Sequence, residues 1–525
     1  MGQQATTSKR LIHNTLFNLL TLVSNALVVF FLIRFFLGQL GEARYGVWVL
    51  IGSIFRYRYV LSMGLNSAVS RHIPVCLAKE DDEGIQRVVN TALFFFSSLG
   101  IMLVAVTFLI YYNVGSWFAI DTDLVRSAKL LVLIVGLSFA VSSPLQVFAA
   151  VLSGLQRYGF ISVVTLVILT VRTIAVVFLL YHGYSLLTMG LVFGISEILS
   201  LSLLCSSVRR LLPNVSLHWR SVDFALLKDM LCYGINTFLY MTGALIVYKV
   251  SNLVIGLFLG MEEVSQFSVA AAGVILLSQF LHAFTGAIKP AVSDLDARGD
   301  LVRVKEIAFL TQKYSLLFII PAGCFLVVMG KEFLTVWMGE KFDDPTTIDS
   351  LAVILAILTV AHCLRLAQHS NFLVLVGLGQ HKVFGILTML MALLCVLGSV
   401  VTVKVLGWGL IGIAWSSFLP MVLIAGVTLP IYFNLRMKIS AWESITQVWR
   451  PAVLGCLPGI AVIAAWKFVS PPNSWLEIFA VVATVAMTTF TFSWAVSLEP
   501  VERERLVRIL SQHRLKPRTQ NTQIL

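Results

Sequence analysis

Apolar residues along this 525-residue chain fall in long runs separated by short polar segments. A helix needs about 20 apolar residues to cross the roughly 30 Å hydrocarbon core of a bilayer, and most of the runs approach or exceed that length. The pattern predicts an all-α polytopic membrane protein with about fourteen spanning helices, at residues 14–37, 45–63, 88–112, 129–151, 160–181, 187–207, 231–257, 264–288, 314–336, 349–376, 384–404, 410–432, 451–469 and 475–497.

An internal repeat relates the first six predicted spans to the next six, because similar short motifs recur at an offset near 218–223 positions. Examples are Gly41-Glu42 with Gly260-Met261-Glu262, and the 154–157 segment with 377–380. Two halves with an even number of helices share one topology, so we expect a pseudo-two-fold axis along the membrane normal. The predicted organisation is a first lobe (1–207), a cytoplasmic linker (208–230), a second lobe (231–432), two further helices (433–497) and a basic cytoplasmic tail (498–525).

Composition supports a membrane protein, since 58% of the residues are apolar and only 12% are charged. Soluble domains carry roughly 45–50% apolar and about 25% charged residues, which argues against a soluble enzyme. The seven cysteines are scattered without a C-x-x-C pair, so we interpret them as packing residues and expect neither a metal site nor a cofactor. The first apolar run lacks a small-residue cleavage site and is expected to be an uncleaved span.

The formal net charge of +12 is distributed unevenly between alternate loops. With the N-terminus inside, the cytoplasmic segments hold many basic residues and the opposite loops hold few beyond Arg44, Lys331, Lys341 and Lys404. The positive-inside rule therefore predicts a multi-pass protein of the cytoplasmic (inner) membrane with both termini cytoplasmic. No basic stripe with interleaved aromatic residues appears, so nucleic acid is not an expected partner.

Charges within the predicted spans are almost all positive. A basic residue at a helix centre costs at least about 2.5–3.5 kcal/mol, so it usually faces a cavity or a partner. Glu197 is the one acid at comparable depth, and Arg172 in the neighbouring span lies at a similar level, which leaves both a neutralising ion pair and an ion-coupling site open. The surplus of cations predicts a cavity for an anionic guest, with five candidate binding residues: Arg56, Arg58, Arg172, Lys249 and Arg365.

Polar residues recur at helical spacing on several spans and are expected to face the same cavity. Interhelical hydrogen bonding is the alternative explanation for any one of them. His362 and His369 have no nearby carboxylate, so they are not interpreted as metal ligands. The faces are formed by Asn14, Asn18, Thr21 and Asn25; by Ser268, Gln279, His282 and Lys289; and by His362, Arg365 and His369.

The chain resembles the polysaccharide-transporter branch, the O-antigen-type flippases, of the multidrug/oligosaccharidyl-lipid/polysaccharide (MOP) exporter superfamily. The residues that carry the resemblance are the opening helix 14–37, Tyr45–Trp48, Gly64–Ala68 with Arg71, and Gly154–Tyr158. The resemblance covers nearly the whole chain. It implies a V-shaped protein with two lobes that moves an oligosaccharide on undecaprenyl pyrophosphate to the outer leaflet by alternating access, with cations in its central cavity.

Alternative functions remain within and outside that class. A lipid II-type flippase would need the same chemistry, whereas a cation-coupled drug exporter would be expected to hold more buried acids. A membrane-embedded glycan polymerase would be expected to show catalytic carboxylates or a large loop. No G-x-x-x-x-G-K-[ST] motif occurs, so an ion gradient (H⁺ or Na⁺), the membrane potential or consumption of cargo would supply the energy. Expected partners are the lipid-linked glycan, membrane lipid and possible polymerase or assembly proteins.

Overall fold

The computed structural model is helical throughout the residues that it describes, which are 2–504 apart from 214, 217, 219, 220, 287, 340, 343, 345, 381, 499 and 501. Side chains are described for these residues except 2–19, 22, 59, 61–63, 233, 234, 236, 237 and 283. Thirteen helical stretches within this part of the chain are long and apolar enough to cross a membrane. The predicted fold class, an all-helical polytopic membrane protein, is confirmed.

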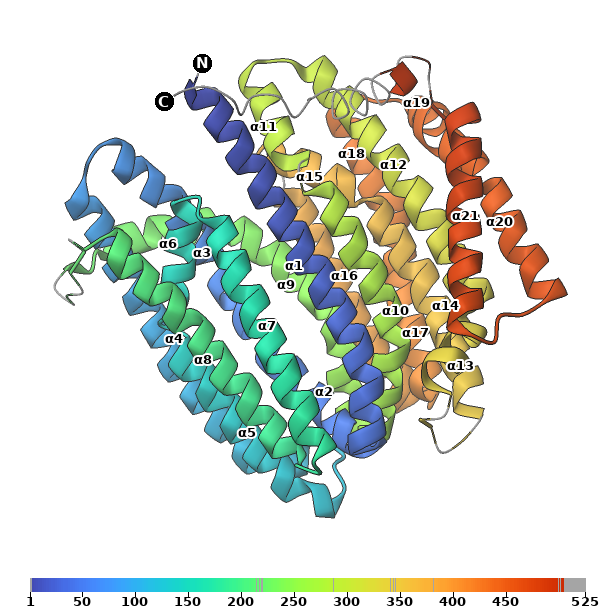
Figure 1. Cartoon of the computed structure of the whole chain (residues 1–525), viewed down its shortest axis with the longest axis horizontal. Helices are drawn as coiled ribbons and strands as arrows, with labels where there is room; N and C mark the ends of the chain where they lie inside the picture. Colours follow the sequence, from blue (N-terminus) through green and yellow to red (C-terminus); the bar gives the residue numbers. More distant parts are fainter. Residues whose placement is uncertain are drawn as a thin grey trace, which may run out of the picture.

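The helices that follow α1 in the first half of the chain form one group, and α1 lies between this group and the second half, where it packs on both α7 and α10 (Met261–Thr285) (Figure 1). The helix predicted at 45–63 is divided, because α2 ends at Arg56 and α3 starts at Arg58 and continues well past the predicted end. Neither α2 nor α3 is among the thirteen apolar stretches, and α2 alone is too short to span. The elements are α1 (Gly2–Leu40), α2 (Glu42–Arg56), α3 (Arg58–Ala78), α4 (Asp82–Trp117), α5 (Thr122–Ser142), α6 (Gln146–Gly154), α7 (Tyr158–Tyr181) and α8 (Leu186–Leu211).

The second half repeats much of this arrangement. The span divided into α5 and α6 corresponds to one divided into α14 and α15, whereas the break between α10 and α11 lies further along the repeat than the break between α2 and α3. The elements are α9 (Phe224–Phe258), α10 (Met261–Thr285), α11 (Ile288–Ala297), α12 (Leu301–Val328), α13 (Gly330–Met338), α14 (Thr346–Ala367), α15 (His369–Gly377), α16 (Lys382–Val400) with η2 (Val401–Val405), α17 (Gly409–Pro420), η3 (Met421–Thr428) and α18 (Leu429–Met437).

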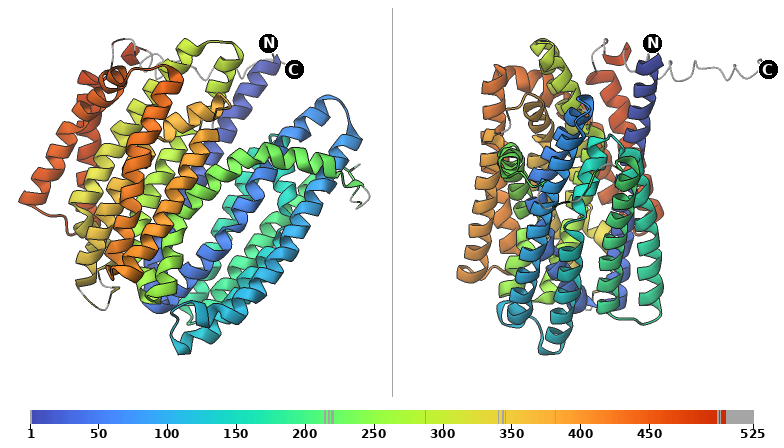
Figure 2. Two further views of the ribbon diagram at one scale, coloured as in Figure 1. Left: turned by 180° about the vertical axis from the view of Figure 1, so that it is seen from behind. Right: turned by 90° about the vertical axis from the view of Figure 1, so that its left-hand side faces the viewer.

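Two helical segments follow and pack on the second half as a hairpin: α19 (Ala441–Ser444) and η4 (Ile445–Trp449) lead into α20 (Arg450–Val469), and α21 (Trp475–Val496) returns. The hairpin lies against α12 at the edge of the molecule (Figure 2). An ion pair between Lys313 and Glu502, with nitrogen and oxygen 2.7 Å apart, fastens one end. A second ion pair, Lys467 with Glu332, fastens the other.

The apolar core explains how the halves are joined. One cluster lies within each half, and a third contains residues of both halves, among them Leu50 and Phe55 of α2 and Met261 and Val264 of α10. The two groups of helices separate toward the end of the molecule that carries the N-terminus (Figures 1 and 2). The molecule is therefore held together at its opposite end, called the far end below.

The connection between the halves is tied to the first half before it enters the second. Asn90 of α4 donates from Nδ2 to the Ser216 carbonyl (2.9 Å), and its Oδ1 accepts from the His218 backbone N–H (3.0 Å). The first turns of α9 then pack on α3 and α4, where Phe224 meets Phe94 at 5.6 Å between ring centroids. Further along, α9 packs on α16, so a single helix spans both groups.

Candidate functional site

A cavity of about 680 Å³ lies between the two groups of helices. Its wall is built by α1, α2, α5, α7 and α8 from the first half and by α9 and α10 from the second. Among the described residues, the side chains of Arg56, Arg172, Lys249 and Glu197 supply its fixed charges. Three basic groups and one acidic group therefore share a single compartment.

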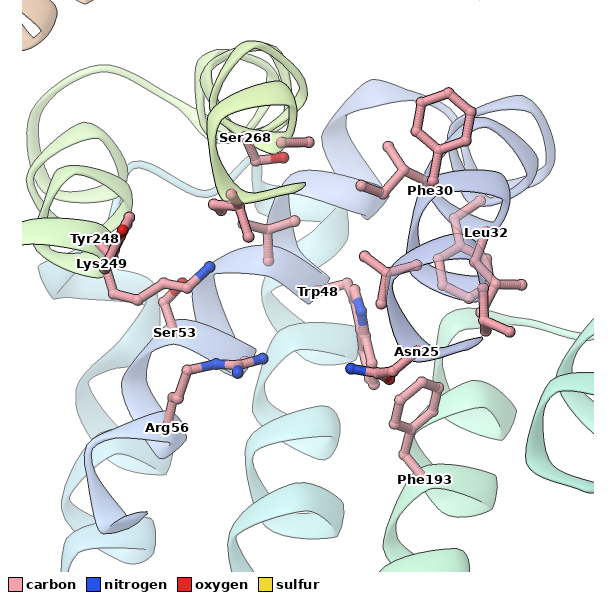
Figure 3. A pocket seen from close by; sticks show the side chains of 18 of the residues that line it. Asn25, Phe30, Leu32, Trp48, Ser53, Arg56, Phe193, Tyr248, Lys249 and Ser268 are labelled. Atoms are coloured by element: carbon pink, nitrogen blue, oxygen red, sulfur yellow. The ribbon is translucent and has the colours of Figure 1, made fainter. Parts of the chain in front are cut away.

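One face of α2 forms a continuous strip of the cavity wall. Its members recur at the spacing of a single helical face. The strip could therefore have been predicted from the sequence, although it was not. Arg56, the last member, is exposed to the cavity. Figure 3 shows the Arg56 and Lys249 side chains and the Asn25 amide pointing into the pocket. The strip consists of Tyr45, Trp48, Val49, Gly52, Ser53 and Arg56.

Arg58 is not a cavity residue, which corrects the sequence-based prediction. The two-residue spacing along the helix directs it away from Arg56, and its side chain is 1% exposed. Its Nη2 donates to Glu197 Oε1 at 2.6 Å, and its Cζ lies 3.8 Å from the Phe139 ring centroid. The carboxylate that the sequence paired with Arg172 is thus held by Arg58.

Arg172 and Lys249 lie where the cavity prediction put them. Arg172 on α7 stacks on Phe193, with its Cζ 4.5 Å from the ring centroid, and lines the wall beside Glu197. Lys249 on α9 is half-buried and lies within electrostatic reach of Arg56. Because Arg56 and Lys249 come from different halves, their mutual repulsion opposes closure of the cavity unless an anion lies between them.

The basic residues of the second half divide into two groups. His282 on α10 lines the cavity and its ring contacts His369 on α15, with 4.3 Å between centroids. His362, Arg365 and His369 are absent from the cavity wall, so for these three the predicted position is wrong. His362 is buried and stacks on the Tyr248 ring at 5.0 Å.

Neutral polar and aromatic groups complete the wall. Asn25, Ser268 and Gln279 line it as their helical spacing predicted, whereas Asn14 and Asn18 belong to the part of α1 whose side chains are not described. Aromatic residues were missed: Trp48 and Phe193 meet edge to face at 4.8 Å, and Tyr248 lies beside Lys249. Large apolar residues recur throughout a membrane protein, so composition alone does not single these out.

A smaller pocket of about 310 Å³ continues from the cavity between α1, α7 and α8. It shares Asn25, Arg172 and Glu197 with the main cavity. Hydroxyl groups dominate the remainder of its wall, which makes it a polar side chamber within apolar helices. They belong to Thr21, Thr165, Ser196 and Ser200.

Close packing of α2 against α9 and α10 closes the far end of the cavity. Gly46 lies so close to α10 that a Cβ atom placed there would be 1.8 Å from the Met261 carbonyl oxygen. Asn252 Nδ2 donates to Ser53 Oγ (3.0 Å), and Gln266 Nε2 donates to Glu42 Oε2 (2.8 Å). The cavity is therefore closed toward the far end.

The arrangement suits the binding of an anion with attached polar groups. Guanidinium and ammonium groups bind phosphate oxygens strongly in a partly desolvated site. Amide, hydroxyl and aromatic groups beside them can bind the hydroxyls and flat faces of sugars. No cluster of three or more His, Cys, Asp or Glu side chains suited to a metal ion is found in the described part of the chain.

Comparison with known proteins places the fold. Residues 39–347 match the family model described as polysaccharide biosynthesis protein. No curated protein sequence is significantly similar to the chain. Among solved structures, the lipid II flippase MurJ in an inward closed conformation matches with a TM-score of 0.68 and 16% identity, over 94% of this chain and 99% of MurJ.

Two other solved structures share the fold. An inward-facing multidrug resistance MATE family transporter of the MOP superfamily has a TM-score of 0.65 and 16% identity, over 81% of this chain and 94% of its own. A MOP superfamily transporter from Pyrococcus furiosus Vc1, described as having a binding pocket of reverse polarity, has a TM-score of 0.58 and 14% identity, over 82% and 96% of the two chains.

Proposed function

The chain belongs to the polysaccharide biosynthesis protein family and has the fold of MOP superfamily transporters, and from this premise we propose that it is a flippase for a lipid-linked oligosaccharide. Its cargo is an oligosaccharide carried on a polyprenyl pyrophosphate, destined for a surface polysaccharide. It acts as a transporter in the cytoplasmic membrane and not as an enzyme. Both termini face the cytoplasm, as the distribution of basic residues predicts.

The observation that carries the proposal is the pair of cations that face one cavity from opposite halves. Arg56 on α2 and Lys249 on α9 both point into the pocket (Figure 3), with Arg172 on the same wall. The acid of the cavity, Glu197, is engaged by Arg58. A pyrophosphate supplies the negative charges that would draw Arg56 and Lys249 together, while the sugars meet the amides and rings beside them.

The closed far end supports alternating access. In the orientation proposed, the cavity opens toward the cytoplasm, where the cargo is made, and the α2–α10 contact blocks the outer side. Binding of the anion lowers the repulsion between the halves and favours their approach at the cytoplasmic end. Cargo entry and closure are thereby coupled through electrostatics.

Other cargoes of this fold are distinguished by charge. A multidrug transporter for organic cations needs negative groups in its cavity, and the basic wall here disfavours it. Lipid II, the cargo named for MurJ, is the second candidate, because the same cations would serve a lipid carrier with another glycan. The two cargoes differ in their sugars, and the cations, which bind the phosphate groups, do not distinguish one glycan from another.

Flipping in proteoliposomes tests the proposal. A polyprenyl pyrophosphate oligosaccharide is incorporated, and its arrival in the opposite leaflet is followed by cleavage with a membrane-impermeant glycosidase. Each charge-assisted hydrogen bond contributes about 1.5–3 kcal/mol, so Arg56→Ala and Lys249→Ala are each expected to slow flipping at least about tenfold. Arg126→Ala, which removes an exposed arginine of α5 outside the cavity, is the matched control. Wild-type flux in the Arg56→Ala, Lys249→Ala double variant would refute the proposal.

A further inference from the structure

Arg365 occupies an unusual position in the second half, behind the cavity wall. Its Cζ lies 4.4 Å from the centroid of the Tyr248 ring, and His362, one turn earlier on α14, stacks on the same ring. The Tyr248 hydroxyl and the Ser278 hydroxyl are hydrogen-bonded, with their oxygens 2.9 Å apart. Tyr248 and Ser278 line the cavity, whereas Arg365 and His362 do not.

The hydrogen-bonding capacity of Arg365 is incompletely used. Its Nε and Nη2 are buried and have no hydrogen-bond partner in the described part of the chain. His362 Nδ1, directly beside it, is buried without a partner as well. A desolvated guanidinium with unmatched donors is unfavourable, and stacking on a tyrosine ring compensates for only part of that cost. The site lacks an acceptor.

Tyr248 separates this unsatisfied cation from the cavity. It precedes Lys249 on α9, and both residues line the pocket (Figure 3). Gln279 and His282, on the cavity side, continue the polar wall around it. A rotation of the Tyr248 side chain, which breaks its hydrogen bond to Ser278 and its stacking contacts with His362 and Arg365, would open Arg365 to the same space that Arg56 and Lys249 share.

We propose that Tyr248 covers a second anion subsite, formed by Arg365 with Lys249 and His282 at its rim, that receives a second negatively charged group of the cargo. The inference rests on the proposed function and extends it, because the first subsite, Arg56 with Lys249, binds one phosphate. The guanidinium fork of Arg365 matches two oxygens of a phosphate or carboxylate. The second group is either the other phosphate of the pyrophosphate or the carboxylate of an acidic sugar.

Anion titration of the purified full-length protein tests the subsite. Inorganic phosphate and pyrophosphate are compared by calorimetry for the wild type, Tyr248→Phe, Tyr248→Ala and Tyr248→Ala with Arg365→Gln. Removing the cover is expected to raise pyrophosphate affinity about tenfold, equivalent to 1.4 kcal/mol, and to leave phosphate affinity unchanged. Tyr248→Phe, which loses only the bond to Ser278, is expected to show a smaller gain, and it serves if Tyr248→Ala does not fold.

Arg365→Gln in the Tyr248→Ala background is expected to cancel the gain. Leu245→Ala, which enlarges the cavity one turn away on the same helix, is the matched control and is expected to give none. A gain that survives Arg365→Gln, or no gain for either pyrophosphate or glucuronic acid 1-phosphate in both Tyr248 variants, overturns the subsite.

The same titrations distinguish a second phosphate from a sugar carboxylate as the source of the second charge. They also distinguish failure of the second subsite from failure of the proposed function. If the second charge is a sugar carboxylate, Tyr248→Ala strengthens binding of glucuronic acid 1-phosphate over glucose 1-phosphate and leaves pyrophosphate unchanged, which retains the subsite and changes its ligand. Arg56→Ala with Lys249→Ala is expected to abolish phosphate binding. Persistence of that binding counts against the first subsite and the proposed function, whereas the Arg365 comparison concerns the second subsite alone. Failure of the wild type to bind either anion overturns both.

Discussion

Arg56 and Arg58 show how two neighbouring residues of one type acquire opposite roles. Successive residues of a helix are rotated by about 100°, so residues two apart point about 200° from each other, and Tyr57, between the two arginines, keeps near-helical backbone angles. Arg56 faces the cavity, while Arg58 is buried against Glu197 and Phe139. The first is available to cargo and the second holds α3 to α8.

Replacement of Arg58 should therefore affect stability where replacement of Arg56 does not. Removing one member of a buried ion pair leaves the other charge desolvated, at a cost of about 3 kcal/mol. We expect Arg58→Ala to lower the melting temperature of the purified protein markedly, and Arg56→Ala to leave it close to the wild type. The charge-balanced variant Arg58→Met with Glu197→Met is expected to recover part of the loss. Equal melting temperatures for the two alanine variants would contradict this assignment.

The site could be predicted in part because depth in the membrane follows from position along a span. Depth identified Arg56, Arg172 and Lys249, and helical spacing identified Asn25 and His282. The direction of a side chain around its helix depends on which helices pack together, which is why Arg58 and Arg365 were assigned to the cavity and the Arg58–Glu197 ion pair was missed. A helical-face argument applied to Tyr45–Arg56 would have separated Arg56 from Arg58.

At the scale of elements, the approach of α2 to α10 decides which end of the cavity is closed. Glycine at position 46 is what permits it, because any Cβ would overlap the backbone of Met261. Gly52, on the same helix, has no atom within 4 Å of the corresponding position. Gly46 therefore permits the contact between α2 and α10, whereas Gly52, which lines the cavity, takes no part in that contact.

This difference yields a paired test. Gly46→Ala is expected to force α2 and α10 apart, to lower thermal stability and to raise the reactivity of a cysteine introduced at Ser53 toward a thiol reagent added from the far side. Gly52→Ala is expected to change neither, since the added methyl projects into open space. If both variants behave like the wild type, the closed end does not depend on this contact.

Hydrophobic runs predicted almost every spanning element, yet they did not define where the helices end. The predicted spans ended at residues 63 and 288, but α3 continues to Ala78 and α11 covers Ile288–Ala297. Hydropathy indicates whether a segment lies in lipid or in water, but it does not indicate where the helical hydrogen bonding of the backbone ends. A helix that leaves the hydrocarbon keeps its hydrogen bonds in water, so its polar turns look like a loop.

For the whole molecule, the proposed orientation has a direct test. The turn at Gly183, between α7 and α8, lies at the far end, and the turn at Gly299, between α11 and α12, lies at the N-terminal end. With Cys232 replaced by serine, Tyr184→Cys is expected to react with a membrane-impermeant maleimide in intact cells. Arg298→Cys is expected to react only after permeabilisation, and the reverse pattern would invert the orientation.

The apolar seam at the far end also makes the transport cycle sensitive to temperature. Opening this end separates residues such as Leu50, Met261 and Val264 and exposes them to water, and exposure of apolar surface raises the heat capacity. Hydrophobic association weakens on cooling, so the outward-open population should grow as the membrane is chilled. A protein working in the cold would need more methyl groups along this seam to keep its resting state sealed.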